Sequence, residues 1–169
     1  SKSTMGIVVI GTSFMDVKGF PHDNYLPTGR NVGHVEYVHG GVARNIVEDI
    51  ANVELRPTFV SIVDDTPLGS AVYQKLVNHK VNTDYVLTRP NGMGTWLAVF
   101  DNNGDLAGSI SSRPDFMPVL DLLEEKGDEI FASADSIVLQ IDLAKEIVKK
   151  TIELAEKHQK KLYALVSNM

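Results

Sequence analysis

Residues 40–45, Gly-Gly-Val-Ala-Arg-Asn, mark the point where an extended segment gives way to a helix. Behind the two glycines, apolar residues recur at helical spacing, at Ile46, Val47, Ile50 and Ala51, and the charged Arg44 and Glu48 are expected on the other side. Glycine lets a ligand approach the backbone, and a helix that begins there offers free N–H groups. Taken alone, the segment equally fits a plain strand-to-helix turn with an exposed Asn45.

Buried strands are predicted on both sides of this turn. Residues 5–11, Met-Gly-Ile-Val-Val-Ile-Gly, form a nearly continuous apolar run, which is typical of a strand buried on both faces of a parallel sheet. Further strands are expected at 58–63, 137–140 and 162–166. Thr66 is a suitable cap for a helix that starts at Pro67 and runs to about residue 79, and another helix is expected over about 143–159. This alternation predicts an α/β fold with a mostly parallel sheet covered by helices on both faces.

Other segments predict a small β flap beside that sheet. Residues 34–39 alternate weakly, and residues 95–100 and 106–110 flank Asp-Asn-Asn-Gly, a good hairpin turn. On residues 95–100, Trp96 and Phe100 share one face while Thr95 and Leu97 take the other. Residues 16–33 have no period and are expected to be a loop.

Composition limits the function classes. The chain has 169 residues, of which 43% are hydrophobic and 22% charged, enough for one soluble domain. Its formal net charge of -6 argues against nucleic acid as a partner, and the lack of cysteine excludes disulfides and thiolate metal sites. With no apolar run long enough to span a membrane and no signal pattern, we expect a cytoplasmic protein without a membrane partner. Residues 1–4, ahead of Met5, are expected to be a tag remnant.

Two aspartates follow predicted strands at the sheet edge where ligands of open α/β sheets bind. Asp16 can accept bonds from sugar hydroxyls, although an aspartate there can also cap a turn. Asp142 can face the same ligand or act as the N-cap of the helix expected near Leu143, and the two roles are compatible.

No metal or nucleotide site is expected in this chain. Asp64 and Asp65 are expected to form a turn rather than a metal site. His34 and His39 are expected on opposite faces of their strand, so they cannot chelate one ion. The sequence contains neither a Gly-x-x-x-x-Gly-Lys-Ser/Thr nor a Gly-x-Gly-x-x-Gly phosphate-binding motif.

Four segments in order resemble the ribokinase-like (PfkB) sugar and nucleoside kinases: residues 7–11 with Asp16, then 40–45, 63–69 and 137–142. The resemblance implies a ribokinase-like doubly wound fold whose β lid lies within about 12–39 and 95–113. It also implies a set of substrate-binding residues: Asp16, Gly40, Gly41, Asn45 and Asp142. Asn31 and Gly33, with Gly-Gly-Val-Ala-Arg-Asn-Ile, look closest to pseudouridine kinases and related nucleoside kinases. Phe14, where ribokinases have Asn, argues against ribose itself.

The same resemblance implies transfer of phosphate from ATP, with Mg²⁺, to a hydroxymethyl group of a sugar or nucleoside. The general base is expected beyond Met169, so ATP and Mg²⁺ would be bound mainly by a C-terminal half that this chain lacks. We therefore expect no catalytic residue here and no kinase activity from the chain alone. A homodimer through the β lid is also expected. The alternative is a non-catalytic metabolite-binding or dimerisation module of the same fold.

Overall fold

The computed structural model describes residues 6–53 and 55–166, so the predicted tag remnant and Met5 lie outside the described residues. The main sheet has five parallel strands in the order β5-β4-β1-β8-β9. These strands are β1 (Ile7–Ile10), β4 (Thr58–Asp64), β5 (Val86–Arg89), β8 (Ser136–Gln140) and β9 (Lys161–Leu165). The predicted parallel α/β fold is confirmed, although β5 was not predicted.

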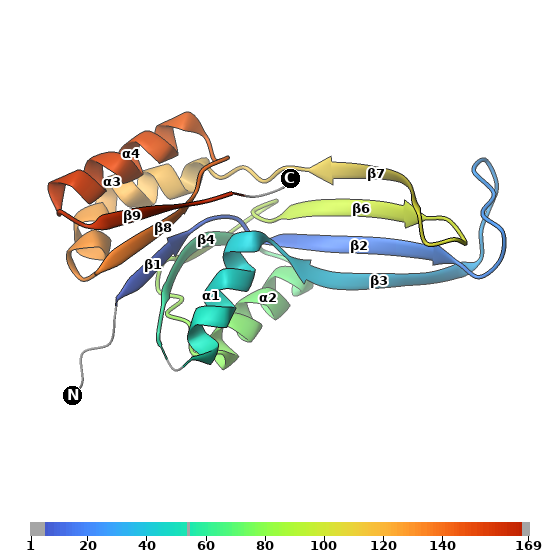
Figure 1. Cartoon of the computed structure of the whole chain (residues 1–169), viewed down its shortest axis with the longest axis horizontal. Helices are drawn as coiled ribbons and strands as arrows, with labels where there is room; N and C mark the ends of the chain where they lie inside the picture. The colour runs from blue at the N-terminus through green and yellow to red at the C-terminus, as the bar shows by residue number, and fades with distance from the viewer. Residues whose placement is uncertain (1–5, 54, 167–169) are drawn as a thin grey trace.

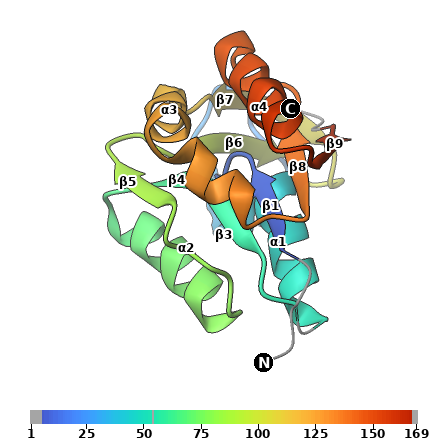
Figure 2. The same ribbon diagram turned by 90° about the vertical axis from the view of Figure 1, so that its left-hand side faces the viewer.

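Helices cover both faces of this sheet (Figure 2). On one side lie α1 (Val42–Asn52) and α2 (Pro67–Asn78), and on the other α3 (Met117–Ala132) and α4 (Lys145–Lys157). Val9 belongs to the apolar cluster under α1 and α2, whereas Val8 and Ile10 belong to the cluster under α3 and α4. The central strand is therefore buried on both faces, as its continuous apolar run predicts.

A second sheet projects from the first as a lid (Figure 1). Its order is β3-β2-β6-β7, with β2 (Phe14–Pro21), β3 (Gly33–Gly40), β6 (Gly94–Phe100) and β7 (Leu106–Ser112). The predicted 101–104 hairpin is confirmed by the antiparallel pairing of β6 with β7. The prediction of a loop over 16–33 is wrong for its first part, because β2 extends to Pro21. Both faces of β2 are only half-buried beyond Met15, so the strand has no apolar alternation to reveal it.

The two lid faces differ in the side chains that they present. Asp16 pairs with Trp96 of β6, and Phe20 pairs with His34 of β3. Because Asp16 and Phe20 are four residues apart on β2, all four side chains lie on the same face of the lid, here called the inner face. There the Phe20 ring stacks on Phe100 with centroids 5.0 Å apart, and Trp96 meets Phe100 edge-on at 6.5 Å. The opposite, outer face presents apolar residues that are largely exposed: Val35, Tyr37, Leu97 and Ile110.

The start of α2 agrees with the sequence prediction, whereas the start of α4 does not. Thr66 caps α2 as predicted, with its hydroxyl accepting from the Gly69 N–H at 3.3 Å. The last predicted helix is shorter than 143–159, because α4 begins at Lys145 with Ala144 as its N-cap. Helix α3 was not predicted. Among the described residues, no helix is both long and apolar enough to cross a membrane.

Candidate functional site

The double glycine forms a tight turn pressed against the β1–β2 connection. Gly41, the N-cap of α1, has φ +96°, a backbone conformation that side chains disfavour. A Cβ at Gly41 would lie 2.8 Å from the Thr12 carbonyl oxygen and 3.1 Å from the Phe14 nitrogen. Glycine is therefore required for both shape and space. The turn leaves the first N–H groups of α1 without helical acceptors, beside the inner face of the lid.

Asp16 rests directly on this turn. A Cβ built on Gly40 would lie 2.9 Å from each oxygen of the Asp16 carboxylate, so the carboxylate packs against the glycine backbone. Burial raises the pKa of Asp16 above its ordinary value, and the nearby charges of Lys18 and Arg44 act in the opposite direction. A half-buried carboxylate beside free helix N–H groups can accept hydrogen bonds from a ligand hydroxyl while those N–H groups donate to its oxygens.

A buried ion pair lies beneath the turn. Arg44 and Glu48 are only 4% and 6% exposed, and their charged ends pair with each other. Arg44 also donates from Nε to the Gly40 carbonyl oxygen at 2.8 Å and from Nη2 to the His39 carbonyl oxygen at 3.0 Å. The expectation that Arg44 and Glu48 lie away from the buried face of α1 is wrong. Sequence patterns place charges outward because they do not show which charges will neutralise each other.

Gln140 holds the end of β1 from the other side. Its Oε1 accepts from both the backbone N–H and the hydroxyl of Thr12, at 2.9 and 3.0 Å. Gln140 is buried, and sequence reasoning assigned no role to its side chain. The only signal for it was its place at the end of a strand that leads to Asp142. These bonds fix the β1–β2 connection on which the glycine turn rests.

Asp142 lies next to a separate small cavity of about 150 Å³. The cavity is lined by Thr12, Phe14, Arg113, Pro114, Phe116, Gln140, Asp142 and Leu143. Asp142 is exposed in the turn after β8, and the alternative in which it is the N-cap of the next helix is wrong, because Ala144 occupies that position. It is thus left free to face a ligand.

Phe14 stands between the two parts of the site. It pairs with Gly40 across the lid, its ring lies over Gly94, and it also lines the Asp142 cavity. On the Gly40 side, the exposed Asn45 lines a shallow depression together with Gly40 and Gly41. The structure therefore brings Asp16, Gly40, Gly41 and Asn45 together, whereas Asp142 lines a different cavity that Phe14 also lines. All five lie beyond the carboxyl ends of the parallel strands.

The residues that were considered as metal ligands, Asp64, His34 and His39, do not form a metal site. Asp64 Oδ1 accepts from the Met93 N–H at 2.7 Å, which ties the end of β4 to the start of β6. His34 pairs with Phe20 and His39 with Met15, so the histidines lie on opposite faces, as predicted. Within residues 6–53 and 55–166, no group of three or more His, Cys, Asp or Glu side chains could hold a metal ion.

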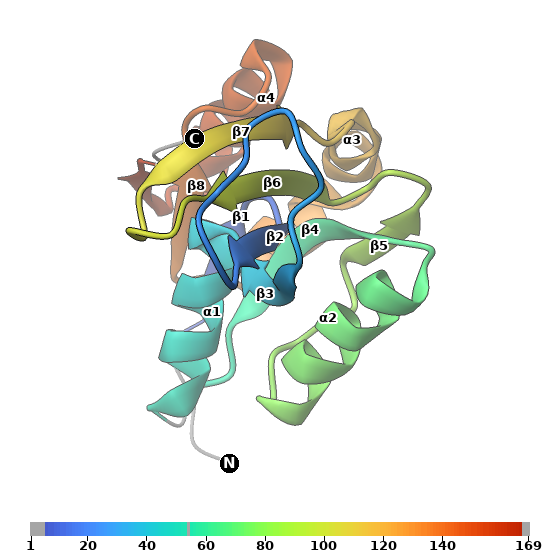
Figure 3. The same ribbon diagram turned by 90° about the vertical axis from the view of Figure 1, so that its right-hand side faces the viewer.

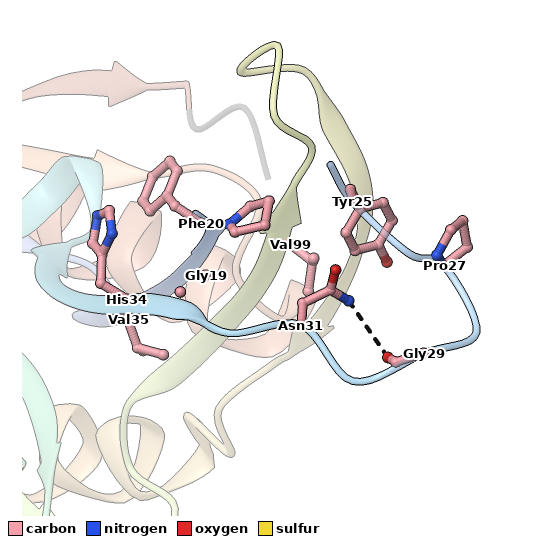
Figure 4. A pocket seen from close by; sticks show the side chains of 11 residues that line it. Gly19, Phe20, Tyr25, Pro27, Gly29, Asn31, His34, Val35 and Val99 are labelled. Atoms are coloured by element: carbon pink, nitrogen blue, oxygen red, sulfur yellow. Dashed lines mark hydrogen bonds between the residues drawn. The ribbon is translucent and has the colours of Figure 1, made fainter. Parts of the chain in front are cut away.

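A further hollow of about 360 Å³ lies near the tip of the lid (Figure 4). Gly19, Val35 and Val99 line its floor from the outer face, while the loop between β2 and β3 provides Tyr25 and Asn31. This loop crosses the far ends of the lid strands (Figure 3). Asn31 fixes the loop: its amide donates to the Leu26 carbonyl oxygen at 2.9 Å and accepts from the Leu26 N–H at 2.8 Å. Phe20 and His34 of the inner face also line the hollow, but Asp16 does not.

Comparison with known proteins gives consistent matches. The family model described as pfkB family carbohydrate kinase matches residues 5–168. A guanosine-inosine kinase of Exiguobacterium acetylicum is 30% identical over 164 residues, which cover 96% of this chain and 54% of that protein. A pseudouridine kinase of Escherichia coli (strain K12) is 26% identical over 106 residues, covering 62% of this chain and 34% of that protein.

Solved structures share the fold. A putative sugar kinase from Clostridium perfringens superposes with a TM-score of 0.83 at 27% identity, covering 98% of this chain and 52% of that one. Arabidopsis thaliana ribokinase, solved with ribose and ATP, has a TM-score of 0.79 at 16% identity, covering 99% and 55%. The chain spans about half the length of these proteins and of the guanosine-inosine kinase.

Proposed function

The chain belongs to the pfkB family of carbohydrate kinases, and we propose that it provides the acceptor-binding side of an ATP-dependent kinase. The acceptor is a sugar or nucleoside whose hydroxymethyl group receives the phosphate. In this proposal Asp16, Asn45 and Asp142 bind acceptor hydroxyls, and Gly40 and Gly41 admit the acceptor to the backbone. Catalysis of this kind depends mainly on positioning and electrostatics, which is what an acceptor site contributes.

The contact of Asp16 with Gly40 carries the proposal. A carboxylate held against a glycine turn, next to the free N–H groups of a helix, provides acceptors and donors within one small surface. Vicinal hydroxyls of a sugar need both. Asp16 and Gly40 belong to β2 and β3 of the lid, so in this proposal the lid forms one wall of the acceptor site and helps to exclude water from it.

ATP and Mg²⁺ are part of the proposal because the chain belongs to a kinase family. The described part of this chain offers no cluster of metal-binding side chains. We therefore assign no step in this chain to the metal or the nucleotide. The residues described here bind and orient the acceptor.

We favour a nucleoside as the acceptor. Two relatives are named for guanosine-inosine and pseudouridine phosphorylation. The half-buried Trp96 pairs with Asp16 on the inner face of the lid. Adjacent strands are about 4.8 Å apart. A ribose bound at Asp16 would then place its base within reach of the Trp96 indole and the neighbouring Phe100 ring.

Replacing Trp96 should weaken the binding of nucleosides but not that of free sugars. We expect Trp96→Ala to raise the KM for guanosine or inosine about tenfold, because stacking of a base on an aromatic ring contributes ~1–3 kcal/mol. The KM for ribose should change little. Steady-state kinetics on the full-length protein test this, with Trp96→Phe as the control because it keeps an aromatic ring at the same place on the inner face. An equal loss for ribose and nucleosides would show that Trp96 only supports the lid.

We also propose a homodimer through the outer face of the lid. Val35, Tyr37 and Ile110 are 59%, 60% and 70% exposed on that face, which gives an apolar surface suited to a partner. Ile110→Lys should convert the dimer to a monomer, since a charge would be buried without a partner. Sedimentation equilibrium on the parent and the variant tests this. A parent protein that is monomeric at high micromolar concentration would exclude the dimer.

The direct test of the proposed function is an acceptor panel. The full-length protein is incubated with ATP, Mg²⁺ and one of guanosine, inosine, pseudouridine, ribose or fructose, and ADP formation is measured. We expect nucleosides to be the best acceptors. Calorimetry on the 169-residue chain should detect acceptor binding that does not need ATP. If no sugar or nucleoside is phosphorylated, the proposed activity is wrong.

A further inference from the structure

The buried ion pair beneath the glycine turn has no evident role in stabilising the core. Arg44 and Glu48 are both buried on α1, where apolar side chains would normally stand, and Glu48 lies beside Lys75 of α2. Removing two charges from water is costly, and well-packed apolar residues often stabilise a protein as much or more. The pair therefore calls for an explanation other than stability.

The guanidinium of Arg44 binds two consecutive carbonyl oxygens, those of His39 and Gly40. Its planar group of donors suits two adjacent acceptors, which a lysine ammonium could not span as well. These carbonyls lie where β3 ends and the turn begins. Glu48 orients the guanidinium from one side, and Lys75 of α2 lies 3.5 Å from the other Glu48 oxygen. The direction in which the chain enters the turn is thus set by one side chain.

The same side chain affects Asp16 in two ways. It holds Gly40, on which the Asp16 carboxylate rests, and its positive charge opposes the rise in the pKa of Asp16 that burial causes. Lys18 on β2 acts in the same direction as Arg44. On the adjacent strands, Glu36 of β3 pairs with Lys18, and the β6 residue opposite Asp16 is the uncharged Trp96.

We propose that Arg44 is a positioning residue of the acceptor site, acting through Gly40 on Asp16. It does not contact the acceptor. It fixes the turn and favours the ionised form of the carboxylate that accepts hydrogen bonds from acceptor hydroxyls. This inference rests on the proposed function, because it concerns the same acceptor.

The test separates positioning from stability. In the double variant Arg44→Met/Glu48→Met, both charges are replaced by apolar side chains, so no buried charge is left without a partner and the fold is retained. The single variant Arg44→Lys keeps a positive charge near Asp16 and Glu48 but loses the bond pair to the two carbonyls. Leu154→Ala in α4, a buried site remote from the turn, serves as the destabilised control.

Kinetics of the full-length protein are measured with the best acceptor among guanosine, inosine, pseudouridine and ribose. In the double variant we expect kcat/KM for the acceptor to fall about tenfold, part of the ~10²-fold that a 1 Å misplacement can cost, with the KM for ATP unchanged. The acid limb of its pH profile should move to higher pH. Arg44→Lys should lose kcat/KM without moving that limb, and Leu154→Ala should show neither effect.

A readout that needs no acceptor is hydrogen exchange of residues 39–46 followed by mass spectrometry. We expect faster exchange there in both Arg44 variants and unchanged exchange in β1 and β8. Parent-like exchange and kinetics in a folded double variant would overturn the inference, even if Asp16→Asn abolished turnover as the proposed function requires. If Asp16→Asn turned over normally, the proposed acceptor site and this inference would both be wrong.

Discussion

Asp16→Asn should lower kcat/KM for the acceptor about a hundredfold or more in the full-length protein, while the KM for ATP stays near that of the parent. Asparagine has nearly the same shape but carries no charge and offers one oxygen in place of two. Each hydrogen bond to a charged group contributes ~1.5–3 kcal/mol, and two acceptor hydroxyls would lose such bonds. A factor of a hundred corresponds to ~2.7 kcal/mol. Steady-state kinetics with each substrate varied in turn measure the effect.

The loss should not come from unfolding. Because burial raises the pKa of Asp16 above its ordinary value of 3.8, the folded state binds this proton more tightly than the unfolded state. The contribution of Asp16 to the free energy of unfolding therefore decreases as the pH rises from 3.8 through the raised pKa, and it is unfavourable at pH 7. Asp16→Asn should accordingly unfold at the same or a higher urea concentration than the parent at pH 7. An inactive variant that is also less stable would leave the site assignment without support.

The main sheet could be predicted from sequence because its strands are buried on both faces. The continuous apolar runs at β1 and β8 reflect that burial directly. The lid was only partly predicted for the opposite reason. β2 contains Lys18, Gly19 and Pro21 and is half-buried along most of its length, so neither alternation nor an apolar run marks it. Its structure comes from pairing with β3 and β6, which are distant in sequence from one another.

The α1 helix shows why the site was harder to predict than the fold. Its apolar spacing favoured a buried face with Ile46, Val47 and Ile50, yet the structure buries Arg44 and Glu48 together with Val47 and leaves Ile46 and Ile50 half-buried. Each charge is tolerated only because its partner lies one turn away and because carbonyl oxygens at the end of β3 accept the remaining bonds. The sequence shows that Arg44 and Glu48 lie one turn apart, but it does not show that carbonyl oxygens will lie beside Arg44. Likewise, the contact of Asp16 with Gly40 depends on the register between β2 and β3, which the sequence does not show.

Gly41→Ala should destabilise the protein by roughly 2–4 kcal/mol and weaken acceptor binding in whatever fraction remains folded. At φ +96° a side chain strains the backbone, at ~1–3 kcal/mol, and a Cβ placed 2.8 Å from the Thr12 carbonyl oxygen adds an overpacking cost of similar size. The neighbours are backbone atoms held by Gln140 and cannot move aside easily. Urea unfolding of the 169-residue chain measures the change.

Gly104→Ala is the matched control that distinguishes backbone strain from overpacking. Gly104 lies in the β6–β7 turn with φ +85°, which is also a backbone conformation that side chains disfavour, but nothing lies within 4 Å of a Cβ built there. It should cost only the backbone part, about 1 kcal/mol, and leave acceptor binding unchanged. The difference between the two variants then measures how closely the turn is pressed onto the β1–β2 connection. Equal losses of stability would mean that backbone strain alone requires glycine at position 41, and that the turn has room to move away from Thr12.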